Sequence, residues 1–143
     1  MGAKRTIHIV GTGTIGEPLI RLLLDAQQAW EVDEITFHKH RPRREDRVKI
    51  QSLIGHGARL AVDAEKMTQF KELGLPPTYE TREALEQATV VIDCTPKGLG
   101  IKHKTEWYEH LPAARGFIAQ GSEFDFGKMY ARGINDTALV PGE

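Results

Sequence analysis

Three glycines near the start of the chain, Gly11, Gly13 and Gly16, constrain the fold more than any other feature. They follow T-I-H-I-V at residues 6–10, a β-branched apolar run that predicts a short buried strand. After them, apolar residues recur over residues 14–28 at the spacing of one helix face. The sequence therefore predicts a strand, a glycine-rich turn and a helix in direct succession.

This order gives each glycine a separate task in a loop that binds phosphate. Gly11 allows a tight turn, Gly13 lets a pyrophosphate approach the backbone, and Gly16 lets the helix lie close to the strand. The amides of Thr14 and Ile15 would then face the phosphates at the positive end of the helix dipole. The alternative is a plain turn between strand and helix that binds no ligand.

The rest of the chain alternates strand and helix patterns, which favours right-handed crossovers and a parallel sheet. Further strands are predicted at residues 33–38, 59–62, 89–94 and 116–119. Helices are predicted at residues 45–54, 63–73, 81–88 and 102–110, with Asp63 and Thr81 as N-caps. We expect one α/β domain of the Rossmann type over residues 1–143, with a doubly wound, mainly parallel sheet. Because the last residues, V-P-G-E, form no closing element, we expect the domain to be truncated.

Composition narrows the partners of such a domain. The chain has 143 residues and a net charge of -1, so it has no overall attraction to nucleic acid or to an anionic membrane. Its apolar runs are far shorter than a membrane span, and its first residues do not resemble a signal peptide. A lone cysteine, Cys94, excludes an internal disulfide and suits a reducing compartment. We therefore expect a soluble cytoplasmic protein.

The segment after the second strand, H-K-H-R-P at residues 38–42, bears on the choice of cofactor. Sites that prefer NAD usually place an acidic residue there for the ribose 2′-hydroxyl, whereas this segment is basic. Lys39 and Arg41, with His40 as a weaker candidate, would pair with a 2′-phosphate, which predicts NADP over NAD. One alternative is a solvated basic face. Another is a nucleic-acid patch over residues 41–49, but acidic residues interrupt it and no aromatic residue lies within it.

Four segments, in their order and spacing, resemble the archaeal-type (class II) glyceraldehyde-3-phosphate dehydrogenases. They are I-H-I-V-G-T-G-T-I-G, K-H-R-P, V-V-I-D-C-T-P-K-G-L-G and F-I-A-Q-G-S-E. The resemblance runs from Ile7 to about Asn135 and covers only the N-terminal, coenzyme-binding part of such enzymes. Two positions depart from the family: V-G-T stands in the first loop where N-G-Y or N-G-F is frequent, and Ser122 stands where a second glycine is common.

The resemblance implies particular contacts with NADP or NAD. Thr14 and Ile15 would contact the pyrophosphate, and Lys39 and His40 would lie by the 2′-phosphate. Beyond the fourth predicted strand, it implies a cofactor cleft lined by Thr95, Pro96 and Gly98, with Gln120 and Gly121 towards the nicotinamide. In the whole enzyme, which is expected to be a homo-oligomer, hydride leaves an enzyme-bound hemithioacetal and phosphate cleaves the resulting thioester. The family's nucleophilic cysteine lies in an S-C-N-T segment that this chain lacks, so the chain alone is expected to be inactive.

No residue of this chain is predicted to be catalytic. Cys94 ends a buried strand beside Asp93, whose negative charge raises the pKa of a thiol, so a structural cysteine is favoured over a nucleophile. The six histidines show no metal-binding spacing, and no metal site is predicted. His8, on the first strand, is expected to be a packing residue.

Two other functions stay open at this point. One is a stand-alone module that senses NADP or NAD, and the other is the coenzyme domain of a different two-domain oxidoreductase, such as a semialdehyde dehydrogenase. If a second domain belongs to the protein, this domain should expose an apolar face, which we expect near Trp107, Tyr108 and residues 124–130.

Overall fold

The strand, glycine turn and helix predicted at the start of the chain are present in the computed structural model. The structure describes residues 4–96, 98–120, 126–130, 132–134 and 136–138. Strand β1 (Thr6–Val10) leads through the glycines into α1 (Gly16–Ala26), which returns the chain to β2 (Glu34–His38) beside β1. Ile20 and Leu23 anchor α1, because both are buried in the core that Ile9 of β1 also joins.

The sheet has six strands in the order β4-β3-β2-β1-β5-β6, and the neighbouring strands are parallel throughout. Its remaining strands are β3 (Arg59–Val62), β4 (Tyr79–Glu80), β5 (Val90–Asp93) and β6 (Gly116–Ala119). From β1 the chain winds outward through β2, β3 and β4, and then returns to the other side of β1 with β5 and β6. This topology confirms the predicted α/β fold of the Rossmann type.

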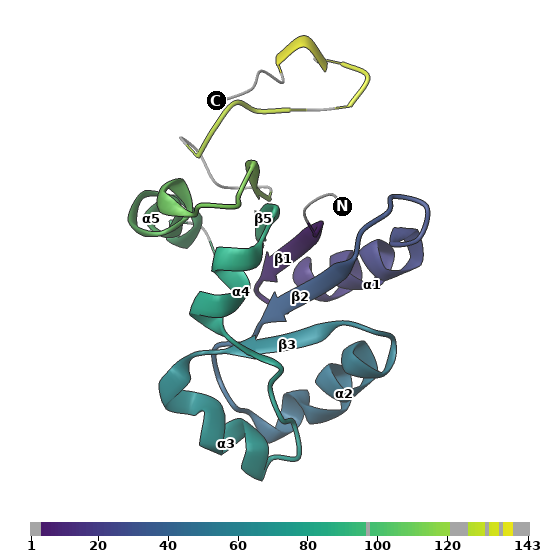
Figure 1. Cartoon of the computed structure of the whole chain (residues 1–143), viewed down its shortest axis with the longest axis vertical. Helices are drawn as coiled ribbons and strands as arrows, with labels where there is room; N and C mark the ends of the chain where they lie inside the picture. Colours follow the sequence, from purple (N-terminus) through teal and green to yellow (C-terminus); the bar gives the residue numbers. More distant parts are fainter. Residues whose placement is uncertain (1–3, 97, 121–125, 131, 135, 139–143) are drawn as a thin grey trace.

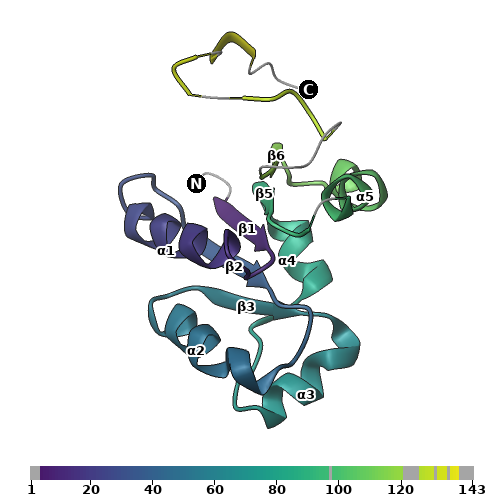
Figure 2. The same cartoon turned by 180° about the vertical axis from the view of Figure 1, so that it is seen from behind.

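Helices cover both faces of the sheet (Figures 1 and 2). Helix α2 (Arg47–Gly55) lies with α1 on one face, whereas α4 (Thr81–Gln87) lies on the other. Successive side chains of a strand point to opposite faces, so Ile9 joins the core under α1 while Val10 packs with Leu85 of α4. The other helices are α3 (Met67–Glu72) and α5 (Leu99–Glu106), and 3₁₀ turns occupy Arg44–Asp46, Ala64–Lys66, Tyr108–His110 and Asp136–Ala138.

The structure confirms the position of one predicted helix cap and corrects the other. Asp63 is the N-cap residue of the 3₁₀ turn that leads into α3, but its side chain caps no amide and instead accepts a hydrogen bond from the Thr81 hydroxyl at 2.7 Å. The N-cap of α4 is Glu80, which forms a reciprocal capping box with Glu83, so Thr81 is not the cap. Strand β4 was not predicted, because two residues are too few to show a strand period.

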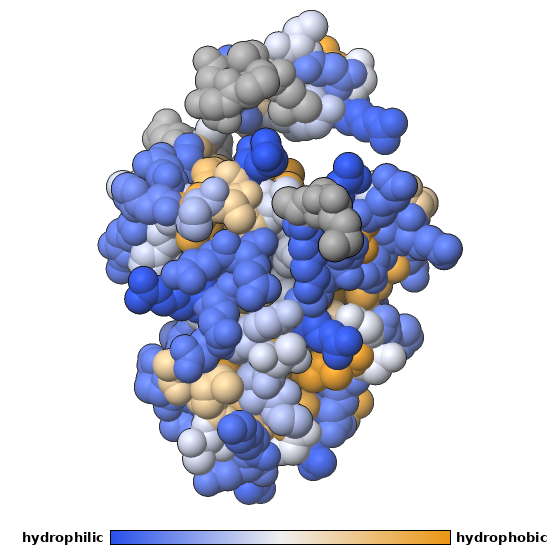
Figure 3. Space-filling model, in the orientation of Figure 1, coloured by the Kyte–Doolittle hydropathy of each residue, from blue (hydrophilic) through white to orange (hydrophobic). Residues whose placement is uncertain are grey.

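In the part of the chain that the structure describes, no helix is both long enough and apolar enough to cross a membrane. Figure 3 shows a mostly hydrophilic face with hydrophobic residues in separate patches. The predicted apolar face is only partly present: Trp107 and Tyr130 are 46% and 44% exposed, but Tyr108 is 1% exposed and Phe126 is 6% exposed. The prediction for Tyr108 was wrong, because its ring packs inside the core beside Leu85 and Val91.

Candidate functional site

A cleft of about 770 Å³ opens at the carboxyl ends of the strands. Its wall takes residues from the ends of β1, β2, β5 and β6, together with the start of the segment after β3. The chain leaves β1 in one direction through β2 and later returns to its other side with β5, so this edge is the topological switch point of the sheet. In open α/β sheets, ligands bind at this position.

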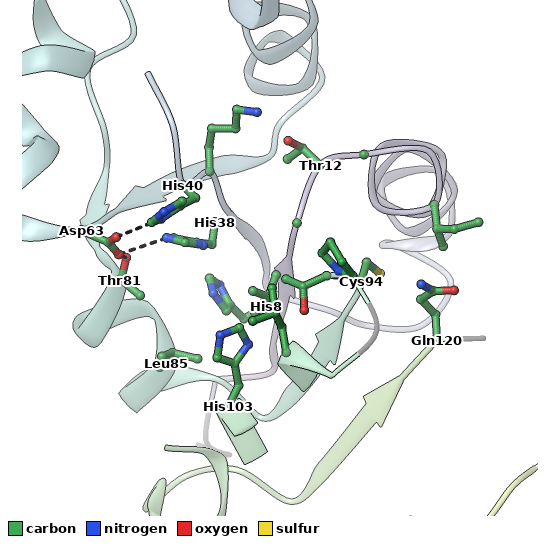
Figure 4. A pocket seen from close by; sticks show the side chains of 18 of the residues that line it. His8, Thr12, His38, His40, Asp63, Thr81, Leu85, Cys94, His103 and Gln120 are labelled. Carbon is green, nitrogen blue, oxygen red and sulfur yellow. Dashed lines mark hydrogen bonds and ion pairs between the residues drawn. The ribbon is translucent and has the colours of Figure 1, made fainter. Parts of the chain in front are cut away.

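The glycine loop lines this cleft, where Figure 4 shows Thr12, and its glycines have different surroundings. Gly11 has a φ of +100°, a left-handed conformation that favours glycine. A Cβ on Gly16 would lie 2.0 Å from the carbonyl oxygen of Gly11, so only glycine lets α1 begin so close to β1. A Cβ on Gly13 would meet nothing within 4 Å, which leaves the backbone there open to the cleft.

The start of α1 supplies hydrogen-bond donors to the cleft. Thr14 and Ile15 are exposed residues of the cleft wall, and no side chain caps the helix there. In the described structure their amides donate to no protein acceptor, as is usual for the first amides of a helix. The Lys49 ammonium donates to the carbonyl oxygen of Thr12 at 2.9 Å and adds positive charge beside the loop. The arrangement can hold an anion against the helix N-terminus.

The basic segment after β2 reaches the cleft only in part. Lys39 and His40 lie in the cleft wall, whereas Arg41 is exposed and does not line it. The Lys39 ammonium is 2.7 Å from a carboxylate oxygen of Asp46, and Lys49 is 3.5 Å from the other oxygen. The hydrogen bond from Lys39 lowers the pKa of Asp46 below its usual range, against the opposing effect of burial. Asp46 thus neutralises part of the positive charge that the sequence predicts here.

Two further basic residues of the cleft wall escaped the sequence prediction, Arg43 and Lys49. Both belong to the run after β2, which we interpreted only through its first residues. Lys49 follows Asp46 by three positions at the start of α2, so the two share a helix face. That spacing was the available signal for the Lys49–Asp46 pair.

A second cluster joins the ends of β2, β3 and α4 (Figure 4). The Nε2 atom of His38 is 3.0 Å from Oδ1 of Asp63, and the Nδ1 atom of His40 is 3.5 Å from Oδ2 of the same carboxylate. The hydrogen bond from His38 is the main cause that holds the pKa of Asp63 well below its ordinary value, and the Thr81 hydroxyl acts in the same direction. Asp63 is therefore an anion that faces two imidazoles. Sequence reasoning missed this cluster.

Beyond β5, a buried carboxylate organises the other wall of the cleft. Asp93 accepts hydrogen bonds from the Tyr108 hydroxyl at 2.6 Å, from Nδ1 of His103 at 2.8 Å and from the Thr95 amide at 2.9 Å, and the Thr95 hydroxyl also donates to it. Burial alone would raise the pKa of Asp93, but these donors hold it below the ordinary value. Asp93 therefore remains ionised and fixes the loop that follows β5.

Only some of the residues that were predicted to contact the cofactor after β5 and β6 line the cleft. Thr95, Pro96 and Gln120 line the cleft. Gly98, with a φ of +91°, precedes α5 and does not line it. Gly121 lies outside the described residues, as does Ser122.

Neither Cys94 nor His8 has the properties of an ionised catalytic group. Burial, aided by the charge of Asp93, raises the pKa of Cys94 to about 11, so the thiol keeps its proton. His8 is fully buried, and burial lowers its pKa to about 3. Its Nδ1 atom is 2.7 Å from the Thr36 hydroxyl, and its Nε2 atom has no hydrogen-bond partner within the described structure. His8 packs in the core as predicted, and it also lines the cleft.

Fold and site together define a Rossmann-type domain with a glycine loop at the switch point of its sheet. The chain matches no protein-family model. It is 32% identical over 119 residues to the glyceraldehyde-3-phosphate dehydrogenase of Methanobacterium bryantii, a match that covers 83% of this chain and 33% of the relative. Glyceraldehyde-3-phosphate dehydrogenase 1 of Methanosarcina acetivorans is 34% identical over 103 residues, which are 71% of this chain and 28% of the relative. The corresponding enzyme of Methanothermus fervidus is 30% identical over 119 residues.

The match spans 28–33% of the length of these relatives. It contains an α/β domain similar to part of archaeal glyceraldehyde-3-phosphate dehydrogenases.

Proposed function

We propose that this chain is the coenzyme-binding domain of an archaeal-type (class II) glyceraldehyde-3-phosphate dehydrogenase and that it binds NADP in preference to NAD. The observation that carries the proposal is the glycine loop at the switch point, where Gly13 is open to the cleft and the amides of Thr14 and Ile15 have no acceptor among the described residues. The cleft volume, about 770 Å³, is within the usual range for cofactor sites. The similarity to archaeal glyceraldehyde-3-phosphate dehydrogenases supports the choice of reaction in this proposal.

In this proposal the residues of the chain bind and orient the cofactor. The Thr14 and Ile15 amides bind the pyrophosphate, helped by the dipole of α1. Thr95 and Pro96 line the cofactor cleft, where the Asp93 hydrogen bonds keep the Thr95 segment in place, and Gln120 lies towards the nicotinamide. The bound nicotinamide supplies the hydride acceptor. The nucleophilic thiol belongs to a segment that this chain does not contain, and the whole enzyme would be a cytoplasmic homo-oligomer.

The preference for NADP rests on the charge beside the adenosine end of the cleft. Lys39, Lys49 and Arg43 all line this wall, and Asp46 is the carboxylate that pairs with the two lysines. A 2′-phosphate would compete with Asp46 for the two lysines, whereas a 2′-hydroxyl has no charge to offer them.

Isothermal titration of the chain with NADP and with NAD tests both parts of the proposal. We expect tighter binding of NADP, and we expect Lys39→Ala to weaken NADP binding by about tenfold or more with a smaller effect on NAD. Lys71→Ala, which removes an exposed lysine of α3 outside the cleft, is the matched control. Binding of neither dinucleotide would contradict the dinucleotide site. Equal affinities that ignore Lys39→Ala would contradict the NADP preference alone.

A further inference from the structure

We propose that His38, His40 and Asp63 form a binding site for a divalent transition metal, with Zn²⁺ as the ion that fits best. The three residues come from the ends of two neighbouring parallel strands. His38 is paired with Ala61 in the β2–β3 register, so the segments that follow the two strands run side by side. His38 and His40 are two positions apart, and Asp63 is two positions beyond Ala61.

Two of the ligand-to-ligand distances in the cluster are close to those around a tetrahedral ion. The three ligand atoms all lie within 4.8 Å of one another. Oδ1 of Asp63 is 3.0 Å from Nε2 of His38, and Oδ2 is 3.5 Å from Nδ1 of His40. In a tetrahedral zinc site with bonds of about 2.0–2.1 Å, neighbouring ligand atoms are about 3.3 Å apart. To bind an ion, the cluster needs small side-chain movements, and the proton that His38 donates to Asp63 must leave Nε2, either for Nδ1 of the same ring or for solvent.

The hydrogen bonds of His40 show that its Nδ1 atom offers a lone pair. The Lys66 ammonium is 2.6 Å from the carbonyl oxygen of His40 and 3.3 Å from Nδ1. An ammonium group can only donate, so Nδ1 is the acceptor in this contact and the ring proton lies on Nε2. Nδ1 of His40 and the carboxylate of Asp63 are thus two acceptors that face each other, with a cation already beside them. A metal ion would replace the Lys66 ammonium beside these two acceptors, and Lys66 would keep its shorter hydrogen bond to the carbonyl oxygen of His40.

The surroundings supply the support that metal ligands need. The Thr81 hydroxyl donates a hydrogen bond to Oδ1 of Asp63 at 2.7 Å and orients the carboxylate. Such outer contacts orient ligands and raise metal affinity. All four residues, Thr81 included, lie in the wall of the open cleft, so a fourth coordination position would face the cleft and take water (Figure 4). Two nitrogen ligands, one carboxylate and one open position are a typical zinc set.

The proposed metal site is additional to the proposed dinucleotide site, and metal binding does not require a bound dinucleotide. Titration of the whole chain with Zn²⁺ in the absence of any dinucleotide tests the site directly. We expect one equivalent to bind, and His40→Ala to weaken binding by about 100-fold or more, because loss of a ligand exceeds loss of an outer contact. His110→Ala, which removes an exposed histidine outside the cleft wall, is the matched control and should leave the affinity unchanged.

Two further variants keep the test decisive if His38 or Asp63 variants fold poorly. Thr81→Val should weaken Zn²⁺ binding by about 10–100-fold. Lys66→Met keeps every ligand and removes a positive charge beside the ion, so it should strengthen binding by about tenfold or more. Histidine ¹⁵N spectra add an atomic readout: Zn²⁺ should shift Nε2 of His38 and Nδ1 of His40, which are opposite ring nitrogens.

Three results would each overturn the proposal. They are the absence of saturable Zn²⁺ binding, an affinity that His40→Ala leaves unchanged, and ring-nitrogen shifts confined to other histidines. The test is separate from that of the dinucleotide site, because a chain that binds NADP but no Zn²⁺ would refute the metal site alone.

Discussion

Substitution of Gly16 by alanine should separate the architecture of the glycine loop from its binding function. A Cβ at this position would lie 2.0 Å from the carbonyl oxygen of Gly11 and 2.8 Å from its carbonyl carbon. An ordinary contact of this kind is about 3.4 Å or longer, so the backbone of the loop or of α1 must move by more than 1 Å. Because both partners are backbone, no flexible side chain can absorb the overlap. Overpacking of this kind destabilises by about 1–3 kcal/mol, and we expect Gly16→Ala to reach the upper end.

Gly13→Ala is the matched control, because a Cβ there meets nothing within 4 Å. Its φ is not among the positive values, so alanine adopts the same backbone without strain and the free energy of unfolding should change by less than about 1 kcal/mol. The added methyl group nonetheless fills the space through which a pyrophosphate would approach the loop. Binding of NADP and NAD should therefore fall together in Gly13→Ala, by about tenfold or more, in a fully folded protein.

Urea denaturation followed by circular dichroism gives the free energies of unfolding, and isothermal titration gives the affinities. A loss of about 3 kcal/mol would be a large part of the total stability of a domain of this size. Wild-type stability in Gly16→Ala would refute the close approach of α1 to the loop. Wild-type affinity in Gly13→Ala would refute the position of the pyrophosphate and leave the fold untouched.

Three other substitutions test the electrostatics of the cleft. His8 has a pKa of about 3 in the folded protein against 6.5 in the unfolded chain, so only the unfolded chain takes up its proton between these values. The free energy of unfolding of the wild type should therefore fall as pH decreases from 6.5 towards 3, by about 1.4 kcal/mol per pH unit from this group. Urea denaturation of His8→Asn should lack that contribution. Parallel pH profiles for the wild type and the variant would contradict this prediction. Tyr108→Phe removes a donor from buried Asp93 and should lower the free energy of unfolding by about 1–3 kcal/mol, measured in the same way; an unchanged value would show that the contact adds nothing. Asp46→Asn removes the ion pair of Lys39, so isothermal titration should show several-fold tighter binding of NADP and an unchanged affinity for NAD. An equal gain in affinity for both dinucleotides would exclude a contact with the 2′-phosphate.

The parts of the fold that the sequence predicted are those with strong local patterns. β1, β3 and β6 begin and end at the predicted residues, because each apolar run is closed by glycine or a polar residue. The predicted helix at 102–110 was misplaced: α5 begins at Leu99 and ends at Glu106. Its sequence, L-G-I-K-H-K-T-E, is weakly amphipathic, so no clear helical period marks where the helix begins and ends.

The site shows the same division between local and distant information. The glycine loop was predicted because its residues are adjacent in sequence, and the close approach of Gly16 is to Gly11 of the same loop. The partner of Lys39 could not be read in this way, since a basic run beside Asp46 is equally compatible with a solvated surface. The contact of His38 with Asp63 joins residues 25 positions apart. Only the strand order brings these two residues together, because β2 and β3 become neighbours through a crossover that no local pattern encodes.

Parallel topology explains why the candidate ligands gather at one edge. Every strand runs in the same direction, so the residues that follow β1, β2, β3 and β5 all emerge on the same side of the sheet. The chain diverges on either side of β1, and no crossover covers the gap between the loops that follow β1 and β5. Polar side chains at the strand ends therefore remain accessible, although the strands themselves are buried. In this chain the glycine loop follows β1, and the proposed metal ligands follow β2 and β3, so His40 of the proposed metal site is adjacent in sequence to Lys39 of the proposed 2′-phosphate site. Because these two residues are neighbours, binding at one site should change the affinity of the other, and the coupling must act equally in both directions.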